Sequence, residues 1–231
     1  ELLIAGGPLD RVLAADAPFR VLADDFTRAW PVQVLEAVGV LRTFAVLSAT
    51  DVRLDPDEPV LLDLDDSDTW VEELAADDPA ESDPALAGAD LSAPPTLRTF
   101  TAVRDLELVD PSRWPAALAE LARPPLRDVI MRSDRFRDTG HPGWGRGSGA
   151  GSPTHAGVSY TRWWLSRNAL LPVAGSATVL PPPELALPGA DPLLDGLFAP
   201  AATLPGVDVD LLRRLGCRLT LSDVLSDPDA V

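Results

Sequence analysis

The sequence predicts an α+β fold, mainly helical, with one small antiparallel sheet. Apolar residues make up 46% of the 231-residue chain and charged residues 24%, which is an ordinary balance for a globular protein. Most of the apolar periodicity has helical spacing. Only the regions 44–64 and 97–109 contain the short apolar or alternating runs that are typical of strands, and these regions are expected to form the sheet.

Residues 1–110 are expected to form a mixed α/β subdomain with an acidic loop at 51–96. Residues 8–47 favour helix, since Pro31 can open a helix and Gly39 can close it, with apolar residues between them at helical spacing. The other elements expected in this half are strands at 44–47, 59–64 and 97–103, a short helix at 68–74, and a proline-rich linker at 77–95.

Residues 111–231 are expected to form a helical subdomain that contains a glycine-rich loop at 138–157. That loop holds seven glycines and both histidines of the chain. Thr161 is expected to be the N-cap of an aromatic helix that runs to Arg167. The other helices are expected at 113–122, 124–131, 191–198, 208–215 and from residue 221 onward.

The charge of the chain excludes several classes of function. Nineteen basic residues against 36 acidic ones give a net charge of −17, so neither nucleic acid nor an anionic membrane is an expected partner. All the basic residues are arginine, which removes the lysine that P-loop, protein-kinase and pyridoxal-phosphate chemistry require. Fifteen of the acids lie in residues 51–90, and we expect this segment to be a solvated surface loop.

The single cysteine, Cys217, excludes an internal disulfide and fits a reducing, cytoplasmic compartment. The first residues, Glu1 to Gly7, have neither the basic region nor the apolar length of a signal peptide or a membrane span. The chain also begins without methionine, so we expect it to be a piece of a longer polypeptide.

The most enzyme-like string is the run from Pro59 to Ser67, in which Asp63 and Asp65 follow apolar residues. It resembles the first motif of haloacid-dehalogenase-type phosphotransferases, where a strand precedes a nucleophilic aspartate and an acid/base aspartate beside Mg²⁺. In this chain Ser67 replaces the usual threonine, and the family's downstream lysine is missing. A Mg²⁺-dependent phosphotransferase that uses Asp63 and Asp65 is the alternative function, against an ordinary acidic turn.

Other chemical patterns are incomplete. An EF-hand loop from Asp63 would need glycine where Asp68 stands and glutamate where Leu74 stands, so only weak cation binding by the acidic segment stays open. His141 and His155 have no zinc-ligand or catalytic-triad spacing and are expected to be exposed loop residues. The sequence therefore provides no catalytic, cofactor-binding or metal-binding residues, and no cofactor is expected.

Two further patterns have a structural and a functional interpretation. The segments 35–43 and 212–220 both place a glycine after a helix and a threonine four residues later. This spacing is typical of helix C-capping, and its functional alternative is a DNA-binding helix-hairpin-helix. Trp163 and Trp164 are expected to anchor a core, with an exposed stacking or peptide-binding surface as the alternative.

Several strings in residues 35–231 occur in the order seen in a known family. They are the runs 100–110, 121–128, 159–164 and 187–194, with Trp114, Leu215 and Gly216. This order resembles the non-catalytic portion of large actinobacterial sacsin-like proteins, which carry an ATP-binding domain of the chaperone-type GHKL superfamily at their N-terminus. The chain's sole asparagine, Asn168, lacks the Mg²⁺-binding context of that domain, and the run 138–143 lacks the strand that precedes its adenine motif.

The resemblance implies a non-enzymatic middle or C-terminal module of a molecular chaperone, with the ATP site in another part of the parent protein. Such a module binds protein segments, or other domains of the parent chain, or relays ATP-driven movement. The expected partners are therefore proteins.

Overall fold

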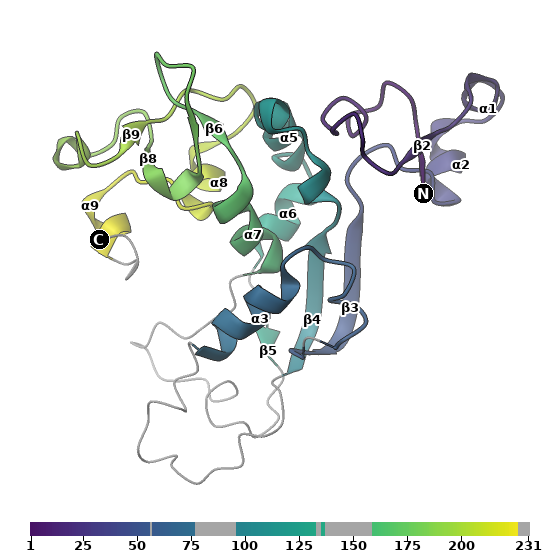
Figure 1. Cartoon of the computed structure of the whole chain (residues 1–231), viewed down its shortest axis with the longest axis horizontal. Coiled ribbons are helices and arrows are strands. Elements are labelled where there is room, and N and C mark those ends of the chain that lie inside the picture. Colours follow the sequence, from purple (N-terminus) through teal and green to yellow (C-terminus); the bar gives the residue numbers. More distant parts are fainter. Residues whose placement is uncertain (56, 77–95, 133–134, 137–158, 226–231) are drawn as a thin grey trace, which may run out of the picture. The chain divides into compact units, whose positions relative to one another are not determined.

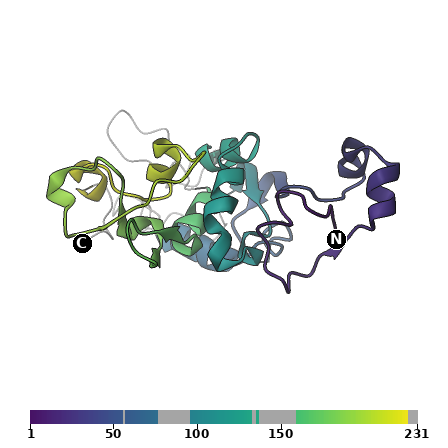
Figure 2. The same ribbon diagram turned by 90° about the horizontal axis from the view of Figure 1, so that it is seen from above.

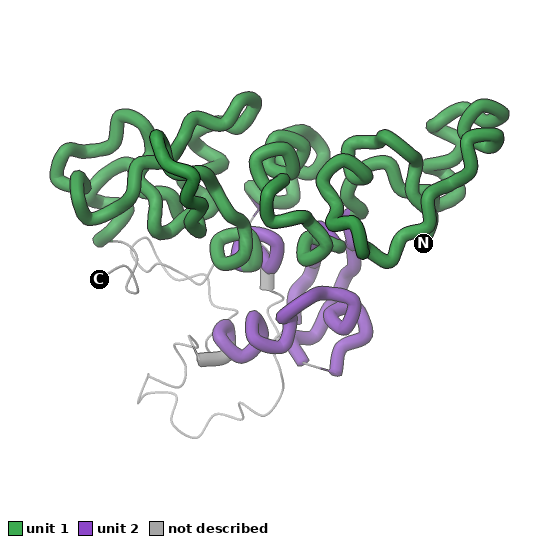
Figure 3. Tube along the Cα trace, turned by 45° about the horizontal axis from the view of Figure 1, so that its top comes forward, with its two compact units in different colours: residues 1–45, 105–131, 164–231 green, residues 46–104, 132–163 purple. Residues whose placement is uncertain are grey.

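The computed structural model describes residues 1–55, 57–76, 96–132, 135–136 and 159–225 (Figure 1). The fold class is α+β, as expected: helices occur together with small sheets, and the three-stranded sheet is antiparallel. The chain divides into two compact units that are discontinuous in sequence (Figure 3). Unit 1 comprises residues 1–45, 105–131 and 164–231, and unit 2 comprises residues 46–104 and 132–163.

These units differ from the expected division after residue 110. Residues from both predicted halves pair within unit 1: Arg113 Nη1 donates to the carbonyls of Arg11 and Leu13 at 3.1 and 3.2 Å. Apolar periodicity reports local structure, so a pairing across about a hundred residues leaves no trace in it.

Unit 2 is built on an antiparallel sheet of three strands, ordered β3 (Val46–Arg53), β4 (Thr96–Val103) and β5 (Arg135–Phe136). The β3–β4 ladder runs from Val46 opposite Val103 to Arg53 opposite Thr96. Asp51 interrupts it with a left-handed φ of 57°, and the register resumes unchanged at the next residue. The predicted strands at 44–47 and 97–103 thus correspond to the start of β3 and to β4.

Helix α3 (Ser67–Ala76) and the first turn of α7 (Tyr160–Asn168) supply the other side chains of the unit 2 core. The Trp70 ring lies 5.8 Å from that of Phe100 and 5.7 Å from that of Tyr160. All three side chains are buried, so an aromatic cluster joins the helices to the sheet.

The predicted strand at 59–64 is wrong, because this segment forms consecutive turns that lead into α3. The amide of Leu61 donates to Glu58 O and that of Leu64 to Leu61 O, both at 2.9 Å. The buried residues accordingly recur every third position, at 61, 64, 67 and 70. The string of leucines and aspartates fits this spacing as well as it fits an alternating strand.

Unit 1 begins with a two-residue parallel pair, β1 (Leu2–Leu3) and β2 (Arg20–Val21), followed by helices α1 (Asp24–Ala29) and α2 (Val32–Ala37). The prediction of helix over the whole of 8–47 is therefore correct only for the two short helices. Residues between β1 and β2 form isolated turns with local hydrogen bonds, and some of their amides donate to distant carbonyls, as Leu9 N does to Arg42 O at 3.1 Å and Ala14 N to Leu108 O at 2.8 Å.

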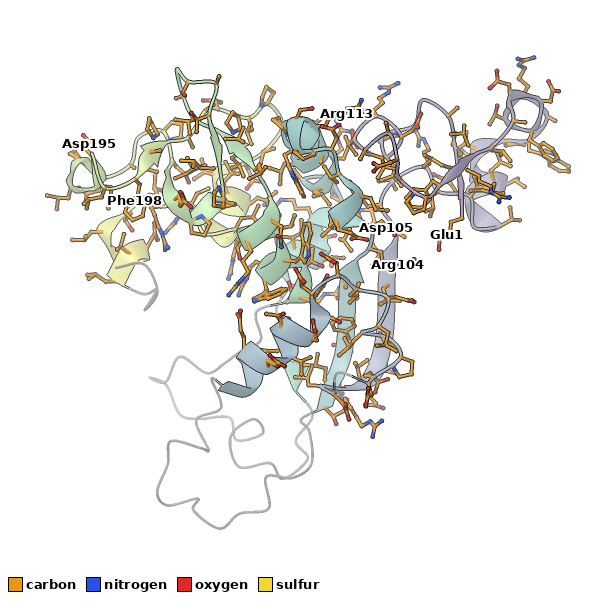
Figure 4. All side chains as sticks on the ribbon, viewed as in Figure 1. Glu1, Arg104, Asp105, Arg113, Asp195 and Phe198 are labelled. Carbon is orange, nitrogen blue, oxygen red and sulfur yellow. The ribbon has the colours of Figure 1, made fainter. Side chains whose placement is uncertain are left out.

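The middle of unit 1 contains two 3-10 turns, η2 (Leu106–Leu108) and η3 (Pro111–Arg113), and then α5 (Trp114–Leu121) and α6 (Leu126–Met131). Arg113, labelled in Figure 4, donates from Nη1 to the carbonyls of Arg11 and Leu13 at 3.1 and 3.2 Å. This guanidinium therefore fixes the start of α5 to the N-terminal segment. Both helices were expected from the sequence.

The C-terminal part of unit 1 consists of short elements. They are the remainder of α7, the hairpin β6 (Leu171–Pro172) and β7 (Val179–Leu180), η4 (Pro182–Glu184), the parallel pair β8 (Leu185–Ala186) and β9 (Ala199–Pro200), η5 (Pro192–Leu194), α8 (Val209–Arg214) and α9 (Leu221–Leu225). Within unit 1, α5 lies between this part and the N-terminal segment, as two views agree (Figures 1 and 2).

Two helix predictions in this region need correction. Only η5 is helical in the predicted helix 191–198, since Pro192 permits one 3-10 turn and Gly196, with a φ of +78°, turns the chain back. Thr161 is not an N-cap: Ser159 precedes α7, and its hydroxyl accepts from the amide of Arg162 at 3.4 Å. Thr161 is instead buried in unit 2, where its Oγ1 accepts from Val103 N at 2.9 Å.

The repeated glycine pattern marks two helix C-caps of the Schellman type, as the structural interpretation expected. After α2, Gly39 N donates to Glu36 O and Val40 N to Leu35 O, both at 3.0 Å. After α8, Gly216 N donates to Arg213 O and Cys217 N to Leu212 O, also at 3.0 Å. The two glycines have φ values of +90° and +107°, a region that favours glycine.

Candidate functional site

Helices α1 and α2 each expose a pair of apolar side chains, Phe26 and Trp30 at α1 and Val34 and Val38 at α2, and we name these four residues the α1–α2 face. Their side chains are 55%, 52%, 41% and 73% exposed, respectively. Phe26 and Trp30 are four residues apart, and so are Val34 and Val38, so each pair lies on one side of its helix or at its end. Apolar side chains at this spacing normally pack into a core, but here they are exposed to solvent.

This exposure follows from the small core beneath the helices. It consists of Ile4, Leu35 and Val40, with Leu22 and Val32 packed against it. Helix α1 buries none of its six residues, and α2 buries only Leu35. Six-residue helices have no intrinsic stability in water, so the pair depends on this cluster and on the cap at Gly39.

The α1–α2 pair lies at the end of unit 1 opposite its C-terminal part (Figures 1 and 2). Each of the two aromatic rings exposes about 100 Å², half of the roughly 200 Å² that such a side chain can bury. With the two valines, the four residues expose a total apolar area comparable with the patches of a few hundred Å² that mark interaction sites on soluble proteins.

Asp63 and Asp65, the residues of the phosphotransferase alternative, are both exposed on the turns before α3. Tyr160 Oη donates to the carbonyl of Asp65 at 2.5 Å, and Ser67 Oγ donates to Leu61 O at 2.7 Å. The hydroxyl at the motif's Thr position is thus buried in a backbone contact. The strand that would present the first aspartate in such enzymes is replaced by a turn.

The carboxylates of the acidic turn before α3 repel one another. The pKa of Asp66 is raised, first by the neighbouring charge of Asp65, then by partial burial and by Asp68. Among the described residues, no group of three or more histidine, cysteine, aspartate or glutamate side chains is arranged to hold a metal ion.

Trp163 and Trp164 are 6% and 3% exposed, which confirms that they anchor cores and excludes an exposed stacking surface. In unit 2, Trp163 Nε1 donates to Glu73 Oε2 at 2.8 Å. In unit 1, the Trp164 ring lies 6.0 Å from that of Trp114, and Asn168 Nδ2 donates to Trp164 O at 3.1 Å. The glycine-rich loop, with His141, His155 and the 138–143 run, lies outside the described residues.

A cavity of about 470 Å³ in unit 1 is lined by Met131, Asp210, Arg213, Arg214 and Asp223. Arg213 is already paired with Asp223, whose carboxylate also accepts from the amides of Leu219 and Thr220 at 2.8 Å. Two guanidinium groups and two carboxylates balance in charge, so the lining favours neither an anion nor a cation.

The neighbouring buried groups also have structural contacts. Arg218, 5% exposed, donates from Nη1 to Asp223 O at 2.9 Å, and its guanidinium lies 5.8 Å from the Phe198 ring labelled in Figure 4. Burial raises the pKa of the Cys217 thiol to about 12, although the charge of Arg218 acts in the opposite direction. A thiol with this pKa is not a nucleophile at neutral pH.

The sequence alone did not identify the α1–α2 face. Its valines were noted only as apolar residues at helical spacing, and Phe26 and Trp30 were not singled out. An amphipathic pattern is the same whether its apolar side faces the chain's own core or a partner. The available signal was local: two aromatic residues, four apart, in a helix that follows two aspartates and ends at Pro31.

None of the helices in the part of the chain that the structure describes is both long and apolar enough to span a membrane. No protein-family model, curated protein or solved structure matches the chain.

Proposed function

We propose that the chain is a mainly helical α+β module that binds protein segments without catalysing a reaction, within a larger sacsin-like, chaperone-type ATPase. The single observation that supports protein binding is the exposed α1–α2 face. The sacsin-like context is supported by the order of the sequence strings described above. The ATP site of the parent protein belongs to another part of that polypeptide.

Protein binding accounts for the energetics of this face. Each half-exposed ring leaves about 100 Å² of apolar surface in water, at a cost of about 2.5 kcal/mol relative to burial. Aromatic side chains next to a small, well-packed core are also the residues that contribute most at protein interfaces. A partner that covers Phe26 and Trp30 recovers this free energy and stabilises two helices that have little support of their own.

The test is the aggregation of insulin reduced by dithiothreitol, followed by light scattering with increasing amounts of the chain. The reductant leaves the chain intact, since it has one cysteine and no disulfide. We expect suppression of scattering, and its loss in the double variant Phe26→Ser/Trp30→Ser. A matched control is Leu193→Ser/Leu197→Ser, which removes two exposed apolar side chains elsewhere in unit 1.

Equal suppression by the wild type and the Phe26→Ser/Trp30→Ser variant would show that the α1–α2 face is not the binding site. Absence of suppression by the wild type would contradict the binding of unfolded protein segments.

A further inference from the structure

We propose that the α1–α2 face binds an amphipathic helix whose apolar stripe is bordered by basic side chains, an inference that rests on the proposed protein-binding function. The observations are the helical spacing of the apolar side chains, the charges that surround them, and the net charge of the chain. Together they specify the shape of the occupant and the sign of its charge.

The shape of the occupant follows from the geometry of the face. Phe26 and Trp30 are one helical turn apart, as are Val34 and Val38, so each pair spans about 6 Å along its helix. An exposed apolar pair one helical turn apart is suited to contact the i, i+3 and i+4 side chains of a partner helix. The aromatic rings are its expected anchors.

The charges on the two helices themselves are predominantly acidic. Residues 24–38 contain three acids, Asp24, Asp25 and Glu36, against one base, Arg28. Arg28 already pairs with Asp24 at 3.5 Å and with Asp25 at 3.8 Å. These ion pairs are well exposed and therefore weak. Three acids against one base leave residues 24–38 with a net charge of −2.

The sign of this charge selects between two occupants. A second copy of the chain would bring the same acidic helices and the same net charge of −17 to the interface. Like charges disfavour such an encounter, whereas a basic helix is attracted over about 10 Å at ordinary ionic strength. A lysine or arginine at its border can also lie over the exposed ring of Trp30.

The experiment compares two labelled helical peptides of about 18 residues with one leucine stripe, carrying lysine or glutamate on the polar face. Binding to the full chain is measured by fluorescence anisotropy at low and high salt. We expect the lysine peptide to bind at least about tenfold more tightly at low salt, and the difference to shrink as salt screens the charges. A lysine peptide of scrambled order, which lacks the stripe, is expected to bind weakly.

Variants locate the site. Phe26→Ser/Trp30→Ser is expected to weaken the lysine peptide by about tenfold or more, while Leu193→Ser/Leu197→Ser leaves its affinity unchanged. Circular dichroism of both variants checks that the fold is kept, as expected for exposed positions. Undiminished binding of the lysine peptide to Phe26→Ser/Trp30→Ser would place it elsewhere on the acidic chain and overturn the inference.

Two other results separate this inference from the proposed function. If both peptides bind equally and Phe26→Ser/Trp30→Ser abolishes both, the preference for a basic helix is wrong and protein binding by the face stands. If sedimentation shows that the wild type is a dimer and that Phe26→Ser/Trp30→Ser is a monomer, a second copy occupies the face and the inference is overturned. Failure to bind either peptide or to suppress insulin aggregation contradicts both proposals.

Discussion

Arg213 and Asp223 form an ion pair across the turn that connects α8 to α9, with Arg213 Nη2 donating to Asp223 Oδ1 at 2.5 Å. The other carboxylate oxygen accepts from the amides of Leu219 and Thr220. Partial burial raises the pKa of Asp223, but the hydrogen bonds from Arg213 and from the two amides outweigh burial and lower it to about 2. One carboxylate therefore organises the last turn of unit 1.

We expect Asp223→Asn to lower the free energy of unfolding at pH 7 by about 1 to 2 kcal/mol. The folded pKa lies below the unfolded value of about 3.9, so the charged carboxylate stabilises the fold above about pH 4. That contribution is lost as the pH falls toward 2, and the variant's stability should change less over this range. Urea denaturation at several pH values measures both effects, with the exposed Asp16→Asn as control. Parallel pH curves for wild type and Asp223→Asn would contradict the prediction.

The two Schellman glycines differ in how tightly they are enclosed, which permits a matched comparison. A Cβ at Gly39 meets no atom within 4 Å, so Gly39→Ala should cost only the strain of a positive φ, about 1 to 2 kcal/mol. At Gly216 the same Cβ would lie 3.1 Å from Cγ of Pro183, so Gly216→Ala should cost more. Hydrogen exchange of the amides of Val40 and Cys217 reports each cap. An equal or larger loss of stability for Gly39→Ala would show that steric enclosure is not the deciding term.

Cys217 should react with a thiol reagent only when the chain opens. Its side chain is 1% exposed and burial raises its pKa to about 12, so in the folded chain the thiol is neither accessible nor ionised at pH 8. We expect slow labelling by an aromatic disulfide reagent in buffer and fast labelling in concentrated urea. The rate should increase in the Gly216→Ala variant, because that cap precedes the cysteine directly. Rapid stoichiometric labelling of the folded wild type would refute this prediction.

Tyr160→Phe should destabilise unit 2 by about 1 kcal/mol, because it removes the hydrogen bond from Tyr160 Oη to the carbonyl of Asp65 and keeps the ring. Thermal unfolding measures the loss. Phe19→Leu in unit 1 is a control for a general effect of altering an aromatic residue, and it should leave unit 2 unaffected. If Tyr160→Phe is as stable as the wild type, the acidic turn does not depend on this tether.

Asp63→Asn should leave both stability and chemistry unchanged. Asp63 is exposed on a turn, and exposed substitutions of this kind alter stability by less than about 0.5 kcal/mol. We expect no hydrolysis of p-nitrophenyl phosphate with Mg²⁺ by the wild type, and none by the variant. Hydrolysis by the wild type that disappears in Asp63→Asn would establish the phosphotransferase alternative instead.

The sequence predicted well those elements whose signals are local. The helices α3, α5, α6, α8 and α9 and the strand β4 appear where spacing and capping residues placed them. Helix α8, expected at 208–215, begins after Asp208, whose side chain accepts from Leu211 N as an N-cap does. The caps at Gly39 and Gly216 follow in the same way from a single residue with freedom at positive φ.

The sequence predicted poorly whatever depends on distant partners. The turns before α3 look like a strand because leucines near an aspartate satisfy a spacing of two and a spacing of three equally well. Thr161 was expected to be an N-cap, but its hydroxyl accepts from the amide of Val103, which lies 58 positions away in sequence. The candidate site was missed for a related reason. The sequence pattern does not show whether the chain has a core that could bury Phe26 and Trp30.

The discontinuous division has a consequence for the order in which the protein is made. Every segment of unit 2 has been synthesised by residue 163, whereas unit 1 needs residues from 164 onward before α5 acquires the ring of Trp164 against Trp114. The inserted sheet can therefore mature first, while residues 1–45 still lack their neighbours from the last segment of unit 1.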